Sequence, residues 1–283
     1  MSWKRRIVRL LDRPGGRGIL GKLATRSARR RTGIDAAIFY DAIWVHRVRD
    51  RYFPDGPRFD YDAGVFDRWV GEDERNSANA REYWFRFRAP KPGDTVVDIG
   101  AGRGEDLIAF SEAVGPTGRV IAIEAHPRTF AVLEHFCRLN RLANVTPLNI
   151  AVMDAVGTVT ISDTEAWEEN AVSRSDGRAG HVVSANSLGA ICAEHAIPTI
   201  DFLKMNIEGA EQYALLGMKD VVDRIGTICV ACHDFRADLG HGEEFRTRDF
   251  VARFFANHGF TLNSRPHHPM DYVRDHLFGT RGN

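Results

Sequence analysis

This sequence of 283 residues contains few cysteines and no long apolar run, and its formal net charge is zero. The four cysteines (Cys137, Cys192, Cys229 and Cys232) lie in apolar surroundings and lack the spacing of a disulfide framework, which favours a reducing compartment. No apolar stretch approaches the roughly 18 residues that a membrane span needs. The residues near the start of the sequence lack the continuous apolar segment that is typical of a secretory signal. We therefore expect a cytoplasmic protein, with peripheral contact at a membrane surface left open.

Charge is balanced in total but unevenly placed along the chain. Lysine and arginine number 38, as do aspartate and glutamate. Residues 1–31 contain one acid, Asp12, and many bases. These bases are Lys4, Arg5, Arg6, Arg9, Arg13, Arg17, Lys22, Arg26, Arg29, Arg30 and Arg31. Residues 3–11 predict a basic amphipathic helix, which contacts either an anionic membrane surface or, in the interpretation we favour, solvent. No stacking aromatics or known module accompany the charge, so we expect no nucleic-acid partner.

The most informative stretch is residues 95–104, which read T-V-V-D-I-G-A-G-R-G. A short apolar run ends in three glycines, Gly100, Gly102 and Gly104, and a helix is expected over residues 105–114. A strand followed by a glycine turn and a helix is the opening unit of an open α/β sheet, which binds a nucleotide-like ligand at its carboxyl edge. A glycine turn alone is weak evidence, because a tight turn without any ligand has the same pattern.

Two carboxylates make the glycine turn more specific. Glu105 stands where a dinucleotide fingerprint has its third glycine, and Asp98 precedes the turn and would repel a pyrophosphate. Glu124 ends the next apolar strand, where it can accept the hydroxyls of a ribose. This combination resembles the class I methyltransferases that use S-adenosylmethionine. The resemblance assigns cofactor binding to the turn and strand-end residues Asp98, Gly100, Ala101, Gly102, Glu124 and Ala125, and adenine contact to Ala151 and its neighbours.

A β-α alternation follows residue 95. The expected strands cover residues 95–99, 119–124, 144–151, 157–162, 201–206 and 227–232, with closing strands at 260–262 and 276–278. The expected helices cover residues 105–114, 127–140 and 248–258. Residues 163–180 are rich in charge and lack an apolar period, so they predict an insertion or lid. Before the alternation, helical spacing predicts helices over residues 34–51 and 76–87. Tyr83 or Phe85 is expected in the core, or closing over the cofactor.

The second informative stretch begins at residue 200 and reads I-D-F-L-K-M-N-I-E-G-A-E. Its strand is expected beside the first strand, so Asn206 and Glu208 would line the same crevice as the glycine turn. The K-x-N-x-E-G-A-E pattern, with D-x-G-A-G-R-G and A-x-E-A-H-P, resembles the FkbM family of methyltransferases. The resemblance covers residues 95–234 and implies O-methylation of a sugar, glycan or secondary metabolite. The family usually has Asp at position 206, and an amide cannot take a proton at neutral pH.

His233 follows the expected strand 227–232 and is our candidate general base for a hydroxyl, with Glu208 and Asn206 as further catalytic candidates. Cys229 and Cys232 form a C-x-x-C pair, but residues three apart in a strand face opposite sides. His267, His268 and Asp271 fit no standard metal spacing. We therefore assign no metal.

The sequence predicts an α/β fold: a doubly wound, mostly parallel seven-stranded sheet of the Rossmann-like class I methyltransferase type, with a helical N-terminal extension. Residues 1–90 are assigned to the extension and 91–283 to the cofactor domain. The predicted function is methyl transfer from S-adenosylmethionine to a small-molecule or glycan hydroxyl. The alternatives are an NAD-type dehydrogenase, a cofactor-binding protein without catalysis, and a membrane-surface adaptor acting through residues 1–31.

Overall fold

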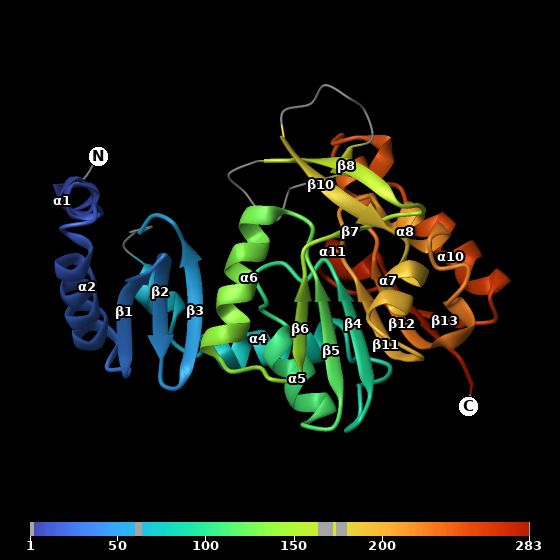
Figure 1. Ribbon diagram of the computed structural model, residues 1–283, viewed down its shortest axis with the longest axis horizontal. Coiled ribbons are helices and arrows are strands. Elements are labelled where there is room, and N and C mark those ends of the chain that lie inside the picture. The colour runs from blue at the N-terminus through green and yellow to red at the C-terminus, as the bar shows by residue number, and fades with distance from the viewer. Residues whose placement is uncertain (1–2, 60–63, 164–171, 174–179, 283) are drawn as a thin grey trace.

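The computed structural model describes residues 3–59, 64–163, 172–173 and 180–282 (Figure 1). Most of the predicted lid, residues 163–180, lies outside the described residues. Among the described residues, no helix combines the length and the apolar character that crossing a membrane requires.

A seven-stranded sheet forms the centre of the molecule (Figure 1). In spatial order its strands are β13 (Thr261–Ser264), β14 (His276–Thr280), β12 (Ile225–Ala231), β11 (Ile200–Met205), β4 (Thr95–Ile99), β5 (Arg119–Ile123) and β6 (Val145–Leu148). β14 runs antiparallel to both of its neighbours, and the other pairs are parallel. β4 and β11 lie side by side, so the chain order reverses between them. The predicted doubly wound sheet is therefore confirmed.

Helices cover both faces of this sheet because its strands are apolar on both sides. Val97 and Ile99 of β4 pack toward one face, and Val96 packs toward the other. The first face is covered by α7 (Leu188–Glu194), α8 (Glu211–Leu216) and α10 (Arg248–Asn257). The second is covered by α4 (Glu72–Tyr83), α5 (Leu107–Val114) and α6 (Pro127–Leu139). Cys229 and Cys232 lie in opposite cores, as their spacing predicts.

The helix predicted over residues 34–51 is wrong. This segment forms antiparallel strands, which with the next segment make a three-stranded sheet. Its strands are β1 (Ala36–Asp41), β2 (Ile43–Val48) and β3 (Arg51–Gly56). Aromatic and β-branched residues favour strands, and Ala42, with φ of 60°, provides the turn. The apolar spacing did not distinguish a helix from a strand, because Ile34 and Ile38 are four residues apart and lie on one side of either element.

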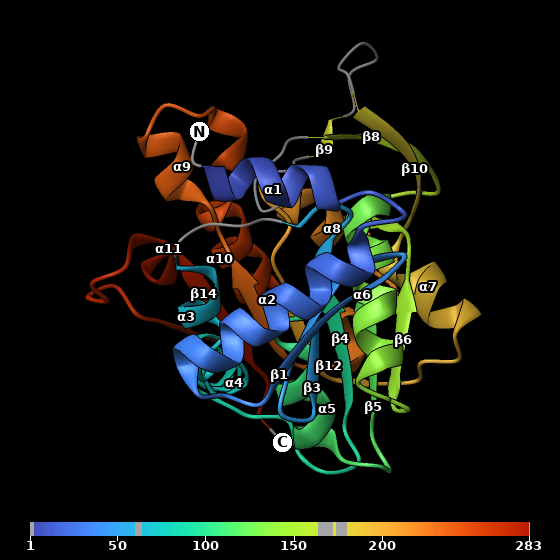
Figure 2. The same ribbon diagram turned by 90° about the vertical axis from the view of Figure 1, so that its left-hand side faces the viewer.

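The N-terminal helices are α1 (Trp3–Leu11), as predicted, and α2 (Arg17–Thr32). Figures 1 and 2 show α2 lying along the small sheet, where Leu20 and Ala28 pack with Trp44. The opposite side of the small sheet contacts α6: the Asn140 side chain hydrogen-bonds both the backbone N–H and the carbonyl of Tyr52. The extension is therefore helical in its first third, forms strands over residues 36–56 and is helical again in α4 (Glu72–Tyr83). A domain boundary near residue 90 stays a prediction.

A four-stranded sheet lies above the carboxyl edge of the main sheet in Figure 1. Its order is β7 (Ala151–Val152), β10 (Gly180–Asn186), β8 (Gly157–Ser162) and β9 (Val172–Ser173). The short remaining helices are α3 (Val65–Arg68), α9 (Asp234–Asp238) and α11 (Asp271–Arg274).

Candidate functional site

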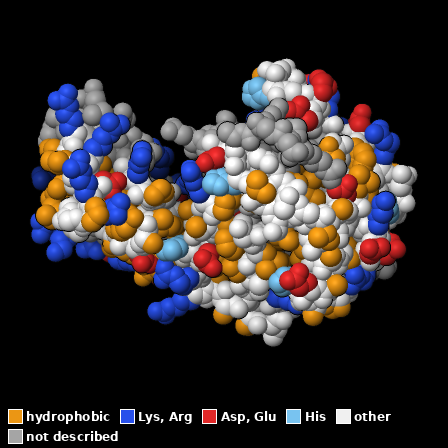
Figure 3. Space-filling model, turned by 45° about the horizontal axis from the view of Figure 1, so that its top comes forward, with side chains coloured by type: hydrophobic (Ala, Val, Ile, Leu, Met, Phe, Trp, Pro, Cys, Tyr) orange, Lys and Arg blue, Asp and Glu red, His pale blue; other side chains and the backbone are white. Residues whose placement is uncertain are grey.

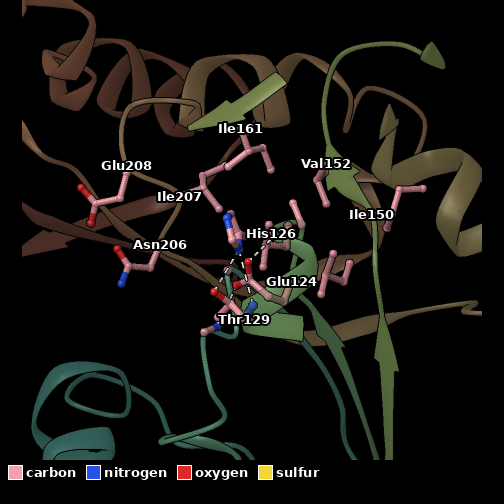
Figure 4. A pocket seen from close by; sticks show the side chains of 14 residues that line it. Glu124, His126, Thr129, Ile150, Val152, Ile161, Asn206, Ile207 and Glu208 are labelled. Carbon is pink, nitrogen blue, oxygen red and sulfur yellow. Dashed lines mark hydrogen bonds between the residues drawn. The ribbon is translucent and has the colours of Figure 1, made fainter. Parts of the chain in front are cut away.

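A pocket opens at the carboxyl ends of β4, β5 and β11, where an open α/β sheet binds its ligand. Its lining residues are Ile99, Gly100, Gly102, Ile123, Glu124, Ala125, His126, Thr129, Ile150, Val152, Ile161, Asn206, Ile207 and Glu208. Figure 4 shows Asn206 and Glu208 on one side, Ile150 and Val152 on the other, and Glu124 with His126 between them. The structure thus brings Gly100, Gly102, Glu124, Ala125, Asn206 and Glu208 together, as the sequence predicts.

The floor of the pocket is formed by two turns in close contact. The backbone N–H of Asn206 donates to the Ile99 carbonyl at 2.9 Å. Gly100 has φ of 78°, and a Cβ there would lie 2.0 Å from the Asn206 carbonyl oxygen. Glycine is therefore required at position 100 both by the backbone conformation and by the neighbouring turn.

Glu124 is held by the backbone around it. Its carboxylate accepts hydrogen bonds from the N–H groups of Gly102, at 3.0 Å, and His126, at 2.8 Å. Burial raises the pKa of Glu124 to about 7, although these two hydrogen bonds act to lower it. Each carboxylate oxygen keeps a lone pair, so Glu124 can accept further hydrogen bonds from ligand hydroxyls.

The opposite end of the pocket is apolar. Ile150, Val152 and Ile161 line it and offer a surface for a flat ring. The predicted contact residue, Ala151, faces away and packs in the small core beneath the four-stranded sheet. The prediction also included the neighbours of Ala151, and these neighbours, Ile150 and Val152, line the pocket because side chains alternate along an extended segment.

Asp98 and Ala101 are also absent from the pocket wall. Asp98 is fully buried, and its carboxylate pairs with the ammonium of Lys204 at 2.8 Å. Lys204 in turn donates to the Gly100 carbonyl at 2.7 Å. Burial raises the pKa of Asp98 and Lys204 acts to lower it, while Asp98 and Asp106 raise the pKa of Lys204. Asp98 therefore neutralises a buried lysine that fixes the glycine turn; the predicted direct contact with a ligand is not what the geometry shows.

Residues before β4 support this buried charge. Trp84 donates from its indole N–H to Asp106 at 2.9 Å, and Lys204 lies 5.2 Å from the centre of the Trp84 ring. Burial raises the pKa of Asp106 to about 6. Phe85 packs against Phe110 in the core, as expected. Sequence reasoning missed Lys204, Trp84 and Asp106, although a lysine inside a predicted apolar strand is itself a signal of a buried charge pair.

His233 is buried between two carboxylates at the end of β12. Its Nε2 lies 3.0 Å from Glu208 and its Nδ1 lies 3.0 Å from Glu211. Burial alone would lower the pKa of His233, but the hydrogen bonds and charges of Glu208 and Glu211 raise it to about 10. The ring is therefore an imidazolium at neutral pH. This arrangement does not favour His233 as the general base, because both of its ring nitrogens already face carboxylates; its catalytic role stays a prediction.

Glu208 is the carboxylate that His233 presents to the pocket. It has φ of 50°, a conformation that costs a non-glycine residue energy and that often marks a functional site. Its second oxygen accepts a hydrogen bond from Arg236 at 2.5 Å. Burial opposes ionisation of Glu208, but His233 and Arg236 lower its pKa overall. The positive φ values of Glu208 and Gly209 also explain why α8 begins at Glu211 and not at residue 208.

The side-chain oxygen of Asn206 is a buried hydrogen-bond acceptor. Its Oδ1 is buried and finds no hydrogen-bond donor within the part of the chain that the structure describes. An unpaired buried acceptor costs free energy, so a ligand donor such as an ammonium group would be favourable beside it. Glu124 for hydroxyls, the isoleucine and valine side chains for a ring, and Asn206 for an ammonium together fit S-adenosylmethionine.

Comparison with known proteins gives one family. The model of the methyltransferase FkbM domain matches residues 98–262, more than half of the chain. The chain is 36% identical over 59 residues to an arsenite methyltransferase of Halobacterium salinarum; the match covers 21% of this chain and 15% of that relative.

Two solved structures are similar in part. One is fibrillarin of Aeropyrum pernix with natively bound S-adenosyl-L-methionine. It is 14% identical in sequence, the match covers 87% of this chain and 98% of that chain, and the TM-score is 0.44. The other is a putative O-methyltransferase of Klebsiella pneumoniae: 12% identity, 79% and 92% coverage, and a TM-score of 0.46. The family match over residues 98–262 includes both the glycine turn and the Asn206 turn. The chain therefore belongs to the FkbM methyltransferase domain family and is an S-adenosylmethionine-dependent methyltransferase.

Proposed function

We propose that this enzyme methylates a hydroxyl oxygen of a sugar, glycan or secondary metabolite. The observation that carries the proposal is the Glu208 carboxylate, which lines the cofactor pocket and is fixed by His233 and Arg236. A fixed carboxylate can accept a hydrogen bond from an acceptor hydroxyl and orient its oxygen. The choice of sugar or metabolite follows the family resemblance.

We assign to Glu208 the role of the base that takes the proton from the acceptor hydroxyl. When bound, S-adenosylmethionine supplies a methyl group that is already activated by its sulfonium. Glu208 is a weak base because His233 and Arg236 lower its pKa. A weak base suffices if the proton leaves late, because an oxygen that has begun to bond to carbon becomes far more acidic than any carboxylic acid. His233 is then a positioning residue, held from behind by Glu211.

A cofactor-binding protein without catalysis is the alternative that Asn206 keeps open. The amide cannot serve as a base, but as an acceptor for the cofactor ammonium it needs no proton. The two functions differ in turnover. The test incubates the full chain with methyl-labelled S-adenosylmethionine and a panel of sugars, nucleotide sugars and phenols, followed by mass spectrometry.

We expect one added methyl on a hydroxyl, as an ether that survives mild alkali. Tight cofactor binding by calorimetry without transfer to any acceptor would favour the non-catalytic alternative. Methylation of a nitrogen, or formation of an alkali-labile ester, would contradict O-methylation of a hydroxyl. NAD in place of S-adenosylmethionine is the control for binding.

Peripheral membrane contact is a second candidate, favoured by the surface of α1 and α2. Leu10 is 64% exposed, Ile19 55% and Leu23 46%. Figure 3 shows basic side chains gathered around this end of the molecule. Exposed apolar side chains among bases are typical of a helix that binds an anionic lipid surface.

Vesicle pelleting tests this contact. The full chain is expected to pellet with vesicles containing about one third phosphatidylserine and to stay in solution with phosphatidylcholine alone, because the bases require anionic lipid. Leu10→Ser with Leu23→Ser should reduce pelleting several-fold. Val156→Ser, which alters another exposed apolar residue, is the matched control. Equal pelleting of the double variant and the control would remove the proposal.

A further inference from the structure

Beside the cofactor pocket, three potential metal ligands converge from three different elements. His126 is the N-cap of α6, Asp163 follows β8, and His181 lies in β10. The ligand atoms of these residues all lie within 4.8 Å of one another. The backbone N–H of His126 holds Glu124, but the proposed methyl transfer does not use the three side chains of this group.

The spacing of the ligand atoms suits a small transition-metal ion. His126 Nε2 lies 3.5 Å from one Asp163 oxygen, and His181 Nε2 lies 3.2 Å from the other. In a tetrahedral zinc site with bonds of about 2.0–2.1 Å, neighbouring ligand atoms are about 3.3 Å apart. Two imidazoles and one carboxylate favour zinc, cobalt and similar ions over magnesium, which prefers oxygen ligands.

His126 provides an independent reason to expect a ligand here. Its side chain is buried, 4% exposed, and its Nε2 makes no hydrogen bond to any described residue. This buried nitrogen, which has no hydrogen bond among the described residues and lies 3.5 Å from the Asp163 carboxylate, is therefore placed to bind a ligand that Asp163 and His181 share.

We propose that His126, Asp163 and His181 bind one Zn²⁺ ion. The ion would join the four-stranded sheet to the N-terminus of α6, beside the cofactor pocket that His126 and Ile161 line. The fourth position would be filled by water. Arg128 now pairs with both oxygens of Asp163, at 3.1 Å and 3.0 Å, and is the cation that zinc would displace. Its side chain is 71% exposed, so it can swing into solvent.

The test uses the tag-free full chain, stripped with chelator and titrated with Co²⁺ as an optical probe, then with Zn²⁺ in competition. We expect one equivalent per chain and a tetrahedral cobalt spectrum. His181→Ala and Asp163→Asn should each weaken binding at least tenfold. Arg128→Ala should strengthen it, because the carboxylate loses its competing partner. His241→Ala, which removes an exposed histidine outside the group, is the control and should change nothing.

Three results would overturn the proposal. The first is no cobalt or zinc binding, which would leave the group as an ion-pair network around Asp163. The second is binding that His181→Ala and Asp163→Asn do not alter, which would place the ion elsewhere. The third is Arg128→Ala binding zinc more weakly than wild type. Circular dichroism of each variant confirms that the fold is retained, and Mg²⁺ should produce no effect at equal concentration.

Discussion

Replacing Lys204 with methionine is expected to lower the free energy of unfolding by about 3–5 kcal/mol at pH 7, because it leaves the carboxylate of Asp98 buried without its partner. Lys204 is 2% exposed and Asp98 is fully buried, so water cannot compensate. The variant also lacks the hydrogen bond from Lys204 to the Gly100 carbonyl, and this hydrogen bond positions the glycine turn. Urea unfolding followed by circular dichroism measures the effect.

The pH dependence identifies the cause of this loss. Without Lys204, Asp98 can become neutral only by binding a proton, and burial already raises the pKa of Asp98. The folded variant would then bind more protons than the unfolded chain, so its stability should rise as the pH falls from 7 to 5. A second change, Asp98→Asn in the Lys204→Met background, should restore part of the stability and remove the excess pH dependence.

Glu124→Gln is the matched control for this ion pair. It removes a carboxylate from the pocket wall, so S-adenosylmethionine should bind at least tenfold more weakly. The urea midpoint should fall less than in Lys204→Met, because the amide loses one backbone hydrogen bond but leaves no charge buried without a partner. The two variants, Lys204→Met and Glu124→Gln, therefore distinguish Asp98 from Glu124, although the sequence predicts cofactor binding for both acids. If Lys204→Met unfolds at the wild-type midpoint, the pair with Asp98 does not stabilise the fold.

The case of Asp98 shows what sequence patterns can establish about this site. The order of strand, glycine turn and helix placed Gly100, Gly102 and Glu124 correctly, because parallel strands deliver their carboxyl ends to one edge. The partner of Asp98 lies 106 positions away, and nothing local predicts it. Direct contact with the ligand was therefore the simpler interpretation of a conspicuous acid.

Alternation and long-range partners explain the other differences. Ala151 was chosen as a ring contact from its place after β6, but the face that a side chain takes depends on a register set by pairing of β7 with β10. His233 was placed correctly after β12, but it lies buried behind Glu208, and its protonation depends on Glu208 and Glu211. Position in the chain thus predicted where residues lie better than the chemical state they adopt.

Glu208→Gln is expected to reduce kcat about 10²–10⁴-fold, because glutamine cannot take the acceptor proton. The affinity for S-adenosylmethionine should change little, because the amide is nearly isosteric and the ribose and ring contacts are elsewhere in the pocket. Calorimetry measures the affinity, and a labelled-methyl assay on whichever acceptor the panel of sugars, nucleotide sugars and phenols yields measures kcat. Glu194→Gln, at an exposed position, is the control. Unchanged kcat would return Glu208 to a structural role.

The pH profile of kcat distinguishes Glu208 from His233 as the base. The pKa of Glu208 is lowered and that of His233 is raised to about 10. With Glu208 as base, kcat should stay level between pH 6 and 8 and fall only as His233 loses its proton near pH 10. If His233 were the base with an ordinary pKa, kcat would rise through pH 6.5. His233→Gln should therefore lower kcat and abolish the alkaline fall, because Glu208 loses its fixed orientation and the titrating ring is gone. A level acid range in wild type, together with loss of the alkaline fall in His233→Gln, would assign the proton to Glu208 and the orientation to His233.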